Sequence, residues 1–279
     1  MLAAVAVAST VTISGPVVSD GKRWAAWKPS SDRAVVYDDR TRTRRRVSVP
    51  DCPLAGVTAG TLLLRCPEMQ NPPEPLLVDV ATGTVTNVGG PDLVSDALGG
   101  LTFSGVGSRG LLVDNQGYHY RQVYAFDWRT RRRQDLDDPS RVVDLNRPEL
   151  TRPLCDGLER TADPGADDPY ENGPPYLPMI YRGRRALEYV RGRIRLWRCG
   201  VRRPRVITTC ACHDFELARG LVTWADTRAR ALDLASGKRR AWKLPVGFGR
   251  VAQAGRTLLL WTERSPAKLR IVRWARRHG

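Results

Sequence analysis

Four carboxylates lie close together in one Pro- and Gly-rich stretch of this 279-residue chain, TADPGADDPYENGPPY. They are Asp163, Asp167, Asp168 and Glu171. Clustered carboxylate oxygens suit Ca²⁺, so these side chains are the candidates for a metal site. Their spacing is not that of a D-x-D-x-D-G calcium loop, and Pro and Gly are typical of exposed loops. We therefore expect a solvated acidic loop without a metal, whose nearby tyrosines suit a contact surface.

The second set of residues that could form bonds or bind a metal consists of six cysteines: Cys52, Cys66, Cys155, Cys199, Cys210 and Cys212. An even number favours disulfides and an oxidising compartment. Cys52 and Cys66 are close in sequence and form the simplest pair, whereas the pairing of the other four stays open. The alternative is a zinc site made by the last three cysteines and His213. The paired Cys-x-x-Cys of structural zinc sites is missing, which favours disulfides.

A motif that would indicate a cofactor stands in the wrong context, and the motif that would present a nucleophile is missing. Residues 105–110 match G-x-G-x-x-G, but a strand-like apolar run follows them, whereas a dinucleotide site needs a helix there. The three histidines are His119, His213 and His278, and no G-x-S-x-G sequence presents a serine nucleophile. We therefore expect no cofactor, and a binding protein rather than an enzyme.

The strands that would position these residues are predicted by a sequence repeat, which recurs about every 40 residues. A complete copy has a turn with Gly, an apolar run that often carries Trp, a second apolar run that ends in Asp, and another turn, whereas the fourth copy is degenerate. Copies begin near residues 19, 60, 110, 187, 220 and 255. Short β-rich runs bounded by Gly, Pro, Asp and Asn are typical of strands, and no helical period is sustained. The sequence therefore predicts an all-β fold, a β-propeller of six four-stranded antiparallel blades.

One position of the sequence repeat is an aspartate at the end of the third strand of a blade. Four copies share it: Asp38, Asp79, Asp127 and Asp233. A carboxylate there can accept hydrogen bonds from the amides of the following turn. Four equivalent aspartates therefore predict a structural role. Because the last copy lacks a fourth strand, we expect residues 11–14 to complete the sixth blade and close the ring.

The first copy, SDGKRWAAW followed by AVVYDDRTRTRRRV, resembles the repeat of TolB-like and WD40-like β-propellers. That repeat reads Ser-Pro-Asp-Gly-Lys, a hydrophobic run, a gap, and then Asp, two residues and Thr-Gly. Here no Pro stands between Ser19 and Asp20, and Arg42 replaces the Gly. The resemblance implies a propeller over nearly the whole chain and a non-catalytic binding scaffold, which in some members of the family lies outside the cytoplasm.

The charge of the chain is strongly positive, at +16, and 40 of its 45 basic residues are Arg. Turns between third and fourth strands hold most Arg clusters, whereas connections between blades hold acids such as Asp51 and Asp214. We therefore predict one basic rim and one mixed or acidic rim. The basic rim would bind a protein or an anionic cell-envelope component; stacking aromatics are scarce among the Arg clusters, which disfavours nucleic acid. The arginines that carry this prediction are Arg44, Arg45, Arg46, Arg131, Arg132, Arg133, Arg239 and Arg240.

The ends of the chain bear on its compartment. Residues 1–10 are interpreted as a signal-peptide remnant or leader, and residues 11–279 as one monomeric propeller domain with an insertion at about 146–181. No apolar run reaches the length of a membrane-spanning helix. We expect secretion or another extracytoplasmic location, or the cytoplasm if Met1 is the natural start. Two functional alternatives stay open: a metal-assisted enzyme at the propeller channel, similar to lactonase or glycan-processing propellers, and electrostatic adhesion through the basic rim.

Overall fold

The architecture was obtained as a computed structural model, in which every regular element of the described residues is a β-strand. The structure describes residues 10–66, 74–90, 93, 100–116, 121–135, 141–143, 145, 151–153, 180–182, 185–198, 201, 203–212, 214–218, 220–243, 248–262 and 267–274. Within these ranges, no helix is long and apolar enough to cross a membrane.

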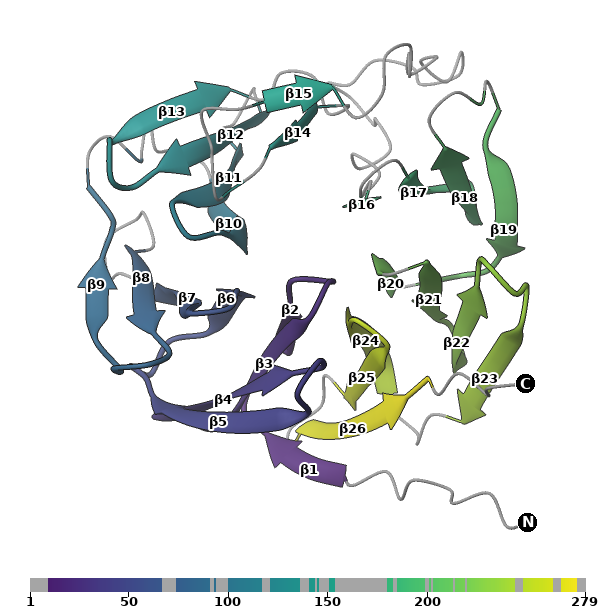
Figure 1. Ribbon diagram of the computed structural model, residues 1–279, viewed down its shortest axis with the longest axis horizontal. Helices are drawn as coiled ribbons and strands as arrows, with labels where there is room; N and C mark the ends of the chain where they lie inside the picture. Colours follow the sequence, from purple (N-terminus) through teal and green to yellow (C-terminus); the bar gives the residue numbers. More distant parts are fainter. Residues whose placement is uncertain are drawn as a thin grey trace.

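Six four-stranded antiparallel sheets are arranged around a common centre, and we number them as blades along the chain (Figure 1). Blade 1 consists of β2 (Val18–Ser19), β3 (Trp24–Ser30), β4 (Arg33–Asp38) and β5 (Thr43–Ser48). Blade 2 consists of β6 (Leu54–Val57), β7 (Thr61–Cys66), β8 (Glu74–Asp79) and β9 (Val85–Asn87). Blade 3 consists of β10 (Gly100–Val106), β11 (Gly110–Gln116), β12 (Arg121–Asp127) and β13 (Arg132–Asp135).

The second half of the chain repeats this arrangement. Blade 4 consists of β16 (Ile180–Arg182), β17 (Arg185–Val190), β18 (Arg193–Arg198) and β19 (Arg205–Thr209). Blade 5 consists of β20 (Asp214–Ala218), β21 (Leu221–Ala225), β22 (Arg228–Asp233) and β23 (Arg239–Lys243). Blade 6 consists of β24 (Phe248–Ala254), β25 (Thr257–Thr262), β26 (Ala267–Arg273) and, from the other end of the chain, β1 (Thr10–Ile13). The predicted six-bladed propeller is confirmed.

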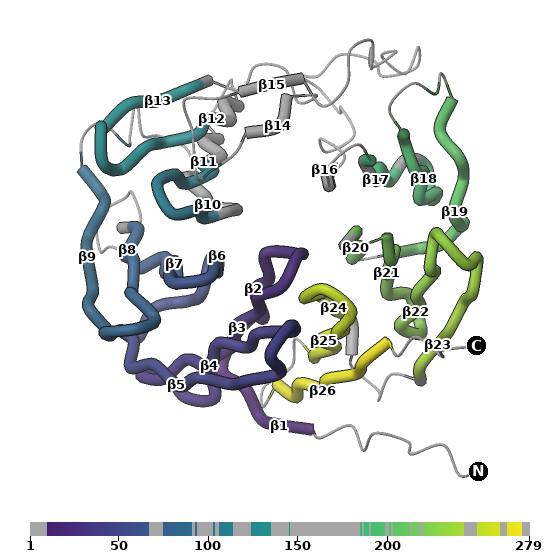
Figure 2. Tube along the Cα trace, viewed as in Figure 1, coloured from purple at the N-terminus to yellow at the C-terminus, as the bar shows by residue number. Residues whose placement is uncertain are grey.

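The ring is closed by the N-terminal strand, as the sequence predicts. β1 pairs antiparallel with β26, from Thr10 opposite Arg270 to Ile13 opposite Ala267. Figure 2 shows the purple trace of β1 beside the yellow trace of β26. A buried contact reinforces this joint, because the Thr257 hydroxyl of blade 6 donates to the Asp39 carboxylate of blade 1 at 2.6 Å. β1 thus supplies the outermost strand of the last blade and joins the two ends of the described chain in one sheet.

The core consists of apolar layers between successive blades. Alternate side chains of a strand point to opposite faces of its sheet, so each blade contributes to two layers. In β7, Leu62 and Leu64 pack against blade 1, whereas Leu63 packs with blade 3, and all three are fully buried. Five such layers join blades 6 and 1, 1 and 2, 2 and 3, 4 and 5, and 5 and 6 among the described residues. Each buried leucine contributes about 2 kcal/mol to the free energy of unfolding. Because its side chains alternate between the two faces, one strand stabilises the contacts of its blade with both neighbouring blades.

Between blades 3 and 4 the chain forms an additional two-stranded sheet, β14 (Arg141–Val143) and β15 (Thr151–Pro153). The region predicted as an insertion at about 146–181 therefore contains β15 and the first residues of β16. The carbonyl of Leu145 accepts a hydrogen bond from the Gly110 amide at 2.7 Å. A Cβ atom on Gly107 would lie 2.3 Å from the backbone of Leu145, so glycine is required there. The G-x-G-x-x-G sequence forms this turn between β10 and β11, in agreement with the strand context expected from the sequence.

The connections of each blade lie alternately on two rims, because neighbouring strands run in opposite directions. We call the first the turn rim; it holds the turns from first to second and from third to fourth strands. The second is the connection rim, which holds the turns from second to third strands and the links between blades. This division separates the repeated features of the chain from its irregular ones.

Candidate functional site

The four aspartates predicted to have a structural role fix turns on the turn rim. Each carboxylate accepts a hydrogen bond from the amide two residues later, at 2.8 Å for Asp38, 2.8 Å for Asp79, 2.9 Å for Asp127 and 3.0 Å for Asp233. The prediction is confirmed. These carboxylates are engaged by their own turns and are not arranged around a common centre for catalysis.

Arginines from turns between first and second strands pair with three of these carboxylates. The pairs are Arg23–Asp38, Arg109–Asp127 and Arg256–Asp233. The hydrogen-bonded Arg23 guanidinium holds the pKa of Asp38 well below its usual range. Burial alone would raise the pKa of Asp127, but the turn amides and Arg109 lower it overall. The carboxylates therefore stay ionised near neutral pH, which suits structural anchors rather than proton donors.

The arginines predicted to lie in basic turns are mostly in the outermost strands instead. Arg44, Arg45 and Arg46 lie in β5, Arg132 and Arg133 in β13, and Arg239 and Arg240 in β23, while Arg131 alone lies in a turn. The placement in the turns was wrong because each turn is short. The outer strand begins one residue after the positive-φ residue in blades 1 and 3, and two residues after it in blade 5.

Several of these arginines connect neighbouring blades. Arg45 donates to a carbonyl of blade 2 at 2.7 Å, Arg131 to another carbonyl of blade 2 at 3.0 Å, and Arg239 to a carbonyl of blade 4 at 3.2 Å. Aromatic rings lie 4.8 to 5.8 Å from the guanidinium groups of Arg44, Arg133 and Arg240. Much of this charge therefore belongs to contacts between and within blades.

Two disulfides lie on the connection rim. Cys52, in the link from blade 1 to blade 2, is bonded to Cys66 at the end of β7, with 4.7 Å between their Cα atoms. The pairing proposed from the sequence is confirmed. Cys210 is bonded to Cys212 in the link from blade 4 to blade 5. Two members of the alternative zinc set are therefore joined to each other, while Cys155 and Cys199 lie outside the described residues, as do the acidic candidates Asp163, Asp167, Asp168 and Glu171.

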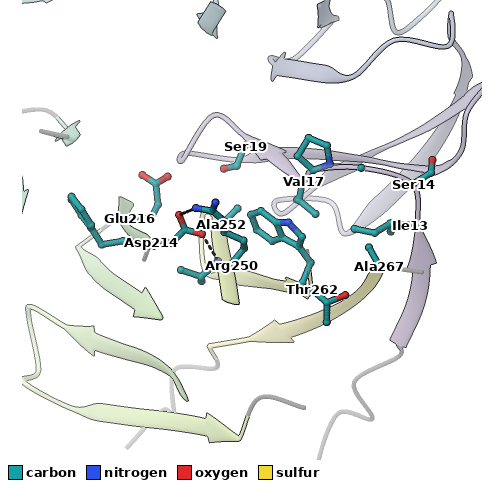
Figure 3. Close-up of a pocket in the computed structure, with 15 residues that line it drawn as sticks. Ile13, Ser14, Val17, Ser19, Asp214, Glu216, Arg250, Ala252, Thr262 and Ala267 are labelled. Atoms are coloured by element: carbon teal, nitrogen blue, oxygen red, sulfur yellow. Dashed lines mark hydrogen bonds and ion pairs between the residues drawn. The ribbon is translucent and has the colours of Figure 1, made fainter. Parts of the chain in front are cut away.

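A pocket of about 600 Å³ lies on the connection rim where blades 5, 6 and 1 meet (Figure 3). We call it the closure pocket, because the chain segment from β1 to β2 forms one of its walls. Inner strands β20 and β24 and the adjoining ends of β25 and β26 form the rest. Its lining residues are Ile13, Ser14, Gly15, Pro16, Val17, Ser19, Asp214, Phe215, Glu216, Arg250, Val251, Ala252, Trp261, Thr262 and Ala267.

One end of the closure pocket is charged. Arg250 Nη1 lies 3.0 Å from Asp214 Oδ1, and the other carboxylate oxygen accepts a hydrogen bond from the Val251 amide at 3.1 Å. Glu216 lies two residues further along β20, and Figure 3 shows it beside Asp214. Both members of the ion pair are partly exposed, so solvent weakens their attraction.

The other end of the closure pocket is apolar. Ile13 and Val17 are buried and pack with Trp261 in the layer between blades 6 and 1. The wall is fixed by the Ser14 amide, which donates to the Lys28 carbonyl at 2.7 Å. Gly15 has φ of +116°, a conformation that L-residues rarely adopt, and this allows the sharp passage from β1 to β2. The pocket therefore depends on ring closure.

The closure pocket was missed in the sequence because its residues come from three blades and share no motif. Asp214 was grouped with the acids between blades, and Glu216 and Arg250 were not identified. The available signal was the pair of acids two residues apart, which places both on one face of an inner strand. Across the ranges that the structure describes, no three His, Cys, Asp or Glu side chains lie close enough together to hold a metal ion, so the hypothesis of a metal-assisted enzyme has no described ligand set.

Comparison with known proteins supports the fold and no particular activity. No family model matches the chain, and no match was found among the curated proteins. Hsv2 from Kluyveromyces lactis is similar in structure, with a TM-score of 0.52 at 8% identity over 95% of this chain and 98% of that one. The AfRom2 CNH domain matches with a TM-score of 0.49 at 10% identity, covering 97% and 98% of the two chains. TolB from Acinetobacter baumannii matches with a TM-score of 0.43 at 10% identity, covering 94% of this chain and 63% of that one. The similarity to Hsv2 supports the propeller fold, and at this identity it indicates no particular role.

Proposed function

We propose that this chain is a non-catalytic, exported β-propeller protein that binds a ligand in the closure pocket. The observation that supports this most directly is the pocket itself, which joins three blades and has a charged end and an apolar end. Its size is within the range of ordinary ligand sites. The repeated aspartates, by contrast, are engaged by their turns.

The lining favours a short peptide segment as the ligand. Asp214, Glu216 and Arg250 supply both signs of charge for backbone or side-chain groups, while Ile13 and Trp261 supply an apolar surface for one side chain. Peptides combine such polar and apolar groups over a few ångströms, which matches the two ends of the pocket. Binding would then depend on the wall formed by the segment from β1 to β2.

A peptide-library selection with matched tryptophan variants tests this function. Ala267→Trp fills the apolar end of the pocket, whereas Ala241→Trp adds the same side chain to an exposed position of β23. Peptides selected by the wild-type protein should bind Ala267→Trp at least tenfold more weakly and Ala241→Trp unchanged. Failure to select any peptide, or equal binding by both variants, would contradict the proposal. Equal melting temperatures of the variants show that the change is local.

The proposal that the protein is exported is supported by its disulfides. Cys52–Cys66 and Cys210–Cys212 favour an oxidising compartment. The intact mass of protein from its native host, measured after thiol alkylation without reduction, should show no alkylated cysteine and a shortened N-terminus. Six alkylated thiols on a full-length chain would indicate the cytoplasm and overturn this part of the proposal.

A second candidate function is adhesion to an anionic surface through the turn rim. The specific observation is that cations of four blades are exposed there, in turns between third and fourth strands or at their ends. They are Arg40, Arg42, Arg129, Arg198, Arg203, Arg205 and Lys238. Three of the turn aspartates are already paired with other arginines, Arg23, Arg109 and Arg256, so they do not neutralise the exposed cations. Dextran sulfate beads should retain the protein at low salt and release it as the salt concentration rises; retention that is independent of salt would contradict adhesion by charge.

A further inference from the structure

The turn of blade 4 differs from the other turns of the turn rim because it exposes apolar side chains among its cations. Val201 is 51% exposed and Val206 49% exposed, and both are close in sequence to exposed arginines. The Val201 amide donates to the Arg198 carbonyl at 3.2 Å, which holds this valine next to the end of β18. We call this group the blade 4 tip: Arg198, Val201, Arg203, Arg205 and Val206.

Only one other large apolar side chain of the described residues is comparably exposed. Val85, in β9 of blade 2, is 44% exposed, and its strand reads Val-Thr-Asn without a charge. Isolated exposed apolar residues are ordinary on protein surfaces. Two of them close to three exposed arginines, with Val201 in the turn and Val206 in the first residues of β19, form a different arrangement, in which apolar groups and cations lie on the same surface. This combination is typical of segments that bind at the headgroup level of anionic bilayers.

The geometry of the propeller favours a planar partner. Turns between third and fourth strands all lie on the turn rim, so one flat surface can meet the exposed cations of blades 1, 3, 4 and 5 together. A bilayer is flat over this distance and carries its charge across its whole surface. Exposed valines gain little from a hydrated polyanion but gain from contact with the acyl region beneath the headgroups.

We infer that the turn rim docks on an anionic lipid bilayer and that the blade 4 tip places Val201 and Val206 at its headgroup–acyl boundary. The inference rests on the adhesive function proposed for the turn rim and names its partner. It also sets the orientation of the molecule, because the closure pocket lies on the opposite rim. A ligand of that pocket would approach from the aqueous side while the protein is bound to the membrane.

Vesicle co-sedimentation of the full chain tests the inference. Vesicles of phosphatidylglycerol and phosphatidylcholine should bind the protein, and vesicles of phosphatidylcholine alone should not. The double variant Val201→Asp, Val206→Asp should bind the anionic vesicles at least tenfold more weakly. Thr209→Asp, at the exposed connection-rim end of the same strand, should bind like the wild type. Unchanged melting temperatures confirm that the variants are folded. Binding of the wild type and the variants is measured at several salt concentrations, because salt weakens attraction between charges but not apolar contact.

The possible failures are distinguishable. Retention on dextran sulfate without binding to anionic vesicles would overturn the bilayer inference and leave electrostatic adhesion intact, with a polyanion or acidic protein as the partner. Vesicle binding that the valine variant does not weaken would overturn the role of the blade 4 tip. Failure to bind either material would overturn both adhesion and the inference.

Discussion

The two rims of this propeller differ in whether their contacts recur from blade to blade. On the turn rim, Asp38 and its counterparts bond to atoms two or three residues away, so each repeat makes its own turn. On the connection rim, the Arg250–Asp214 pair spans 36 residues, and Ser14 contacts Lys28 over 14 residues. Each contact of the second kind exists only once. The repeat therefore builds the scaffold, and the irregular rim acquires the disulfides and the pocket.

The difference predicts where the fold is vulnerable. The amide hydrogen bonds of a turn aspartate involve only its own turn, so they can re-form whenever its strands meet. A contact between distant residues fixes parts that the repeat alone does not hold together. Substitutions on the two rims should therefore differ in size and in how far their effects extend along the chain.

The largest effect is expected from removing the Cys52–Cys66 disulfide. It closes a loop with a sequence separation of 14, and in the chain-entropy description its loss costs about 3 kcal/mol. The Cys210–Cys212 disulfide, with a separation of 2, should be worth about 1.5 kcal/mol by the same relation. Urea unfolding of the two double Cys→Ser variants measures both values. Equal losses would show that loop length does not set their contributions.

The next effect is expected on the turn rim, from Asp38→Asn. The side chain is buried, hydrogen-bonded to its turn and paired with Arg23. Loss of the charge should lower the free energy of unfolding by about 2 kcal/mol, as for hydrogen bonds to charged groups. Asp79→Asn is the matched control, because Asp79 accepts the same turn bonds at an exposed position. A loss at Asp79 as large as that at Asp38 would contradict the importance of the arginine pair.

The same carboxylate predicts a pH dependence. In the folded protein the pKa of Asp38 is lowered, chiefly by its hydrogen bond from Arg23. Its contribution is therefore present above the unfolded pKa, about 4, and is lost as the pH falls towards the folded value. Between pH 4 and pH 2 the stability of the wild type should fall more steeply than that of Asp38→Asn, by up to about 1.4 kcal/mol per pH unit. Parallel curves from urea unfolding at several pH values would argue against this assignment.

The sequence was informative where contacts are local. Leu62, Leu63 and Leu64 make up the apolar run that predicts β7, and Asp79 ends the next strand, as the repeat predicts. Closure by β1 was also predictable, since counting strands leaves one blade incomplete. β16 was missed because Ile180–Arg182 is only three residues long and follows a Pro-rich stretch.

Long-range features were not predictable by the same reasoning. Ser14, Asp214 and Arg250 become neighbours of one pocket only after three blades have packed, and no local pattern records that packing. The arginines of β5 and β13 were assigned to turns because sequence alone does not show where a tight turn ends. The contacts of Arg45 in β5 and Arg239 in β23 with carbonyls of neighbouring blades depend on the ring geometry in the same way.

The smallest effect compares two arginines at one turn position. Arg42 and Arg131 both have positive φ, 63° and 58°, where blades 2 and 5 use Gly83 and Gly237. Replacing Arg42 by Gly relieves a conformation that costs an L-residue about 1 kcal/mol, so Arg42→Gly should be more stable by about that amount. Arg131→Gly loses the bond to the Val88 carbonyl and should gain less or be destabilised.

Thermal unfolding of the two glycine variants, with Arg129→Gly as a control in an exposed turn residue, measures this difference. An equal gain at Arg42 and Arg131 would mean that the inter-blade hydrogen bond adds no stability. A gain at Arg42 alone would show that the same backbone strain is tolerated for different reasons. In blade 3 the arginine compensates for it by holding blade 2, whereas in blade 1 its side chain remains exposed, on the rim proposed to bind an anionic bilayer.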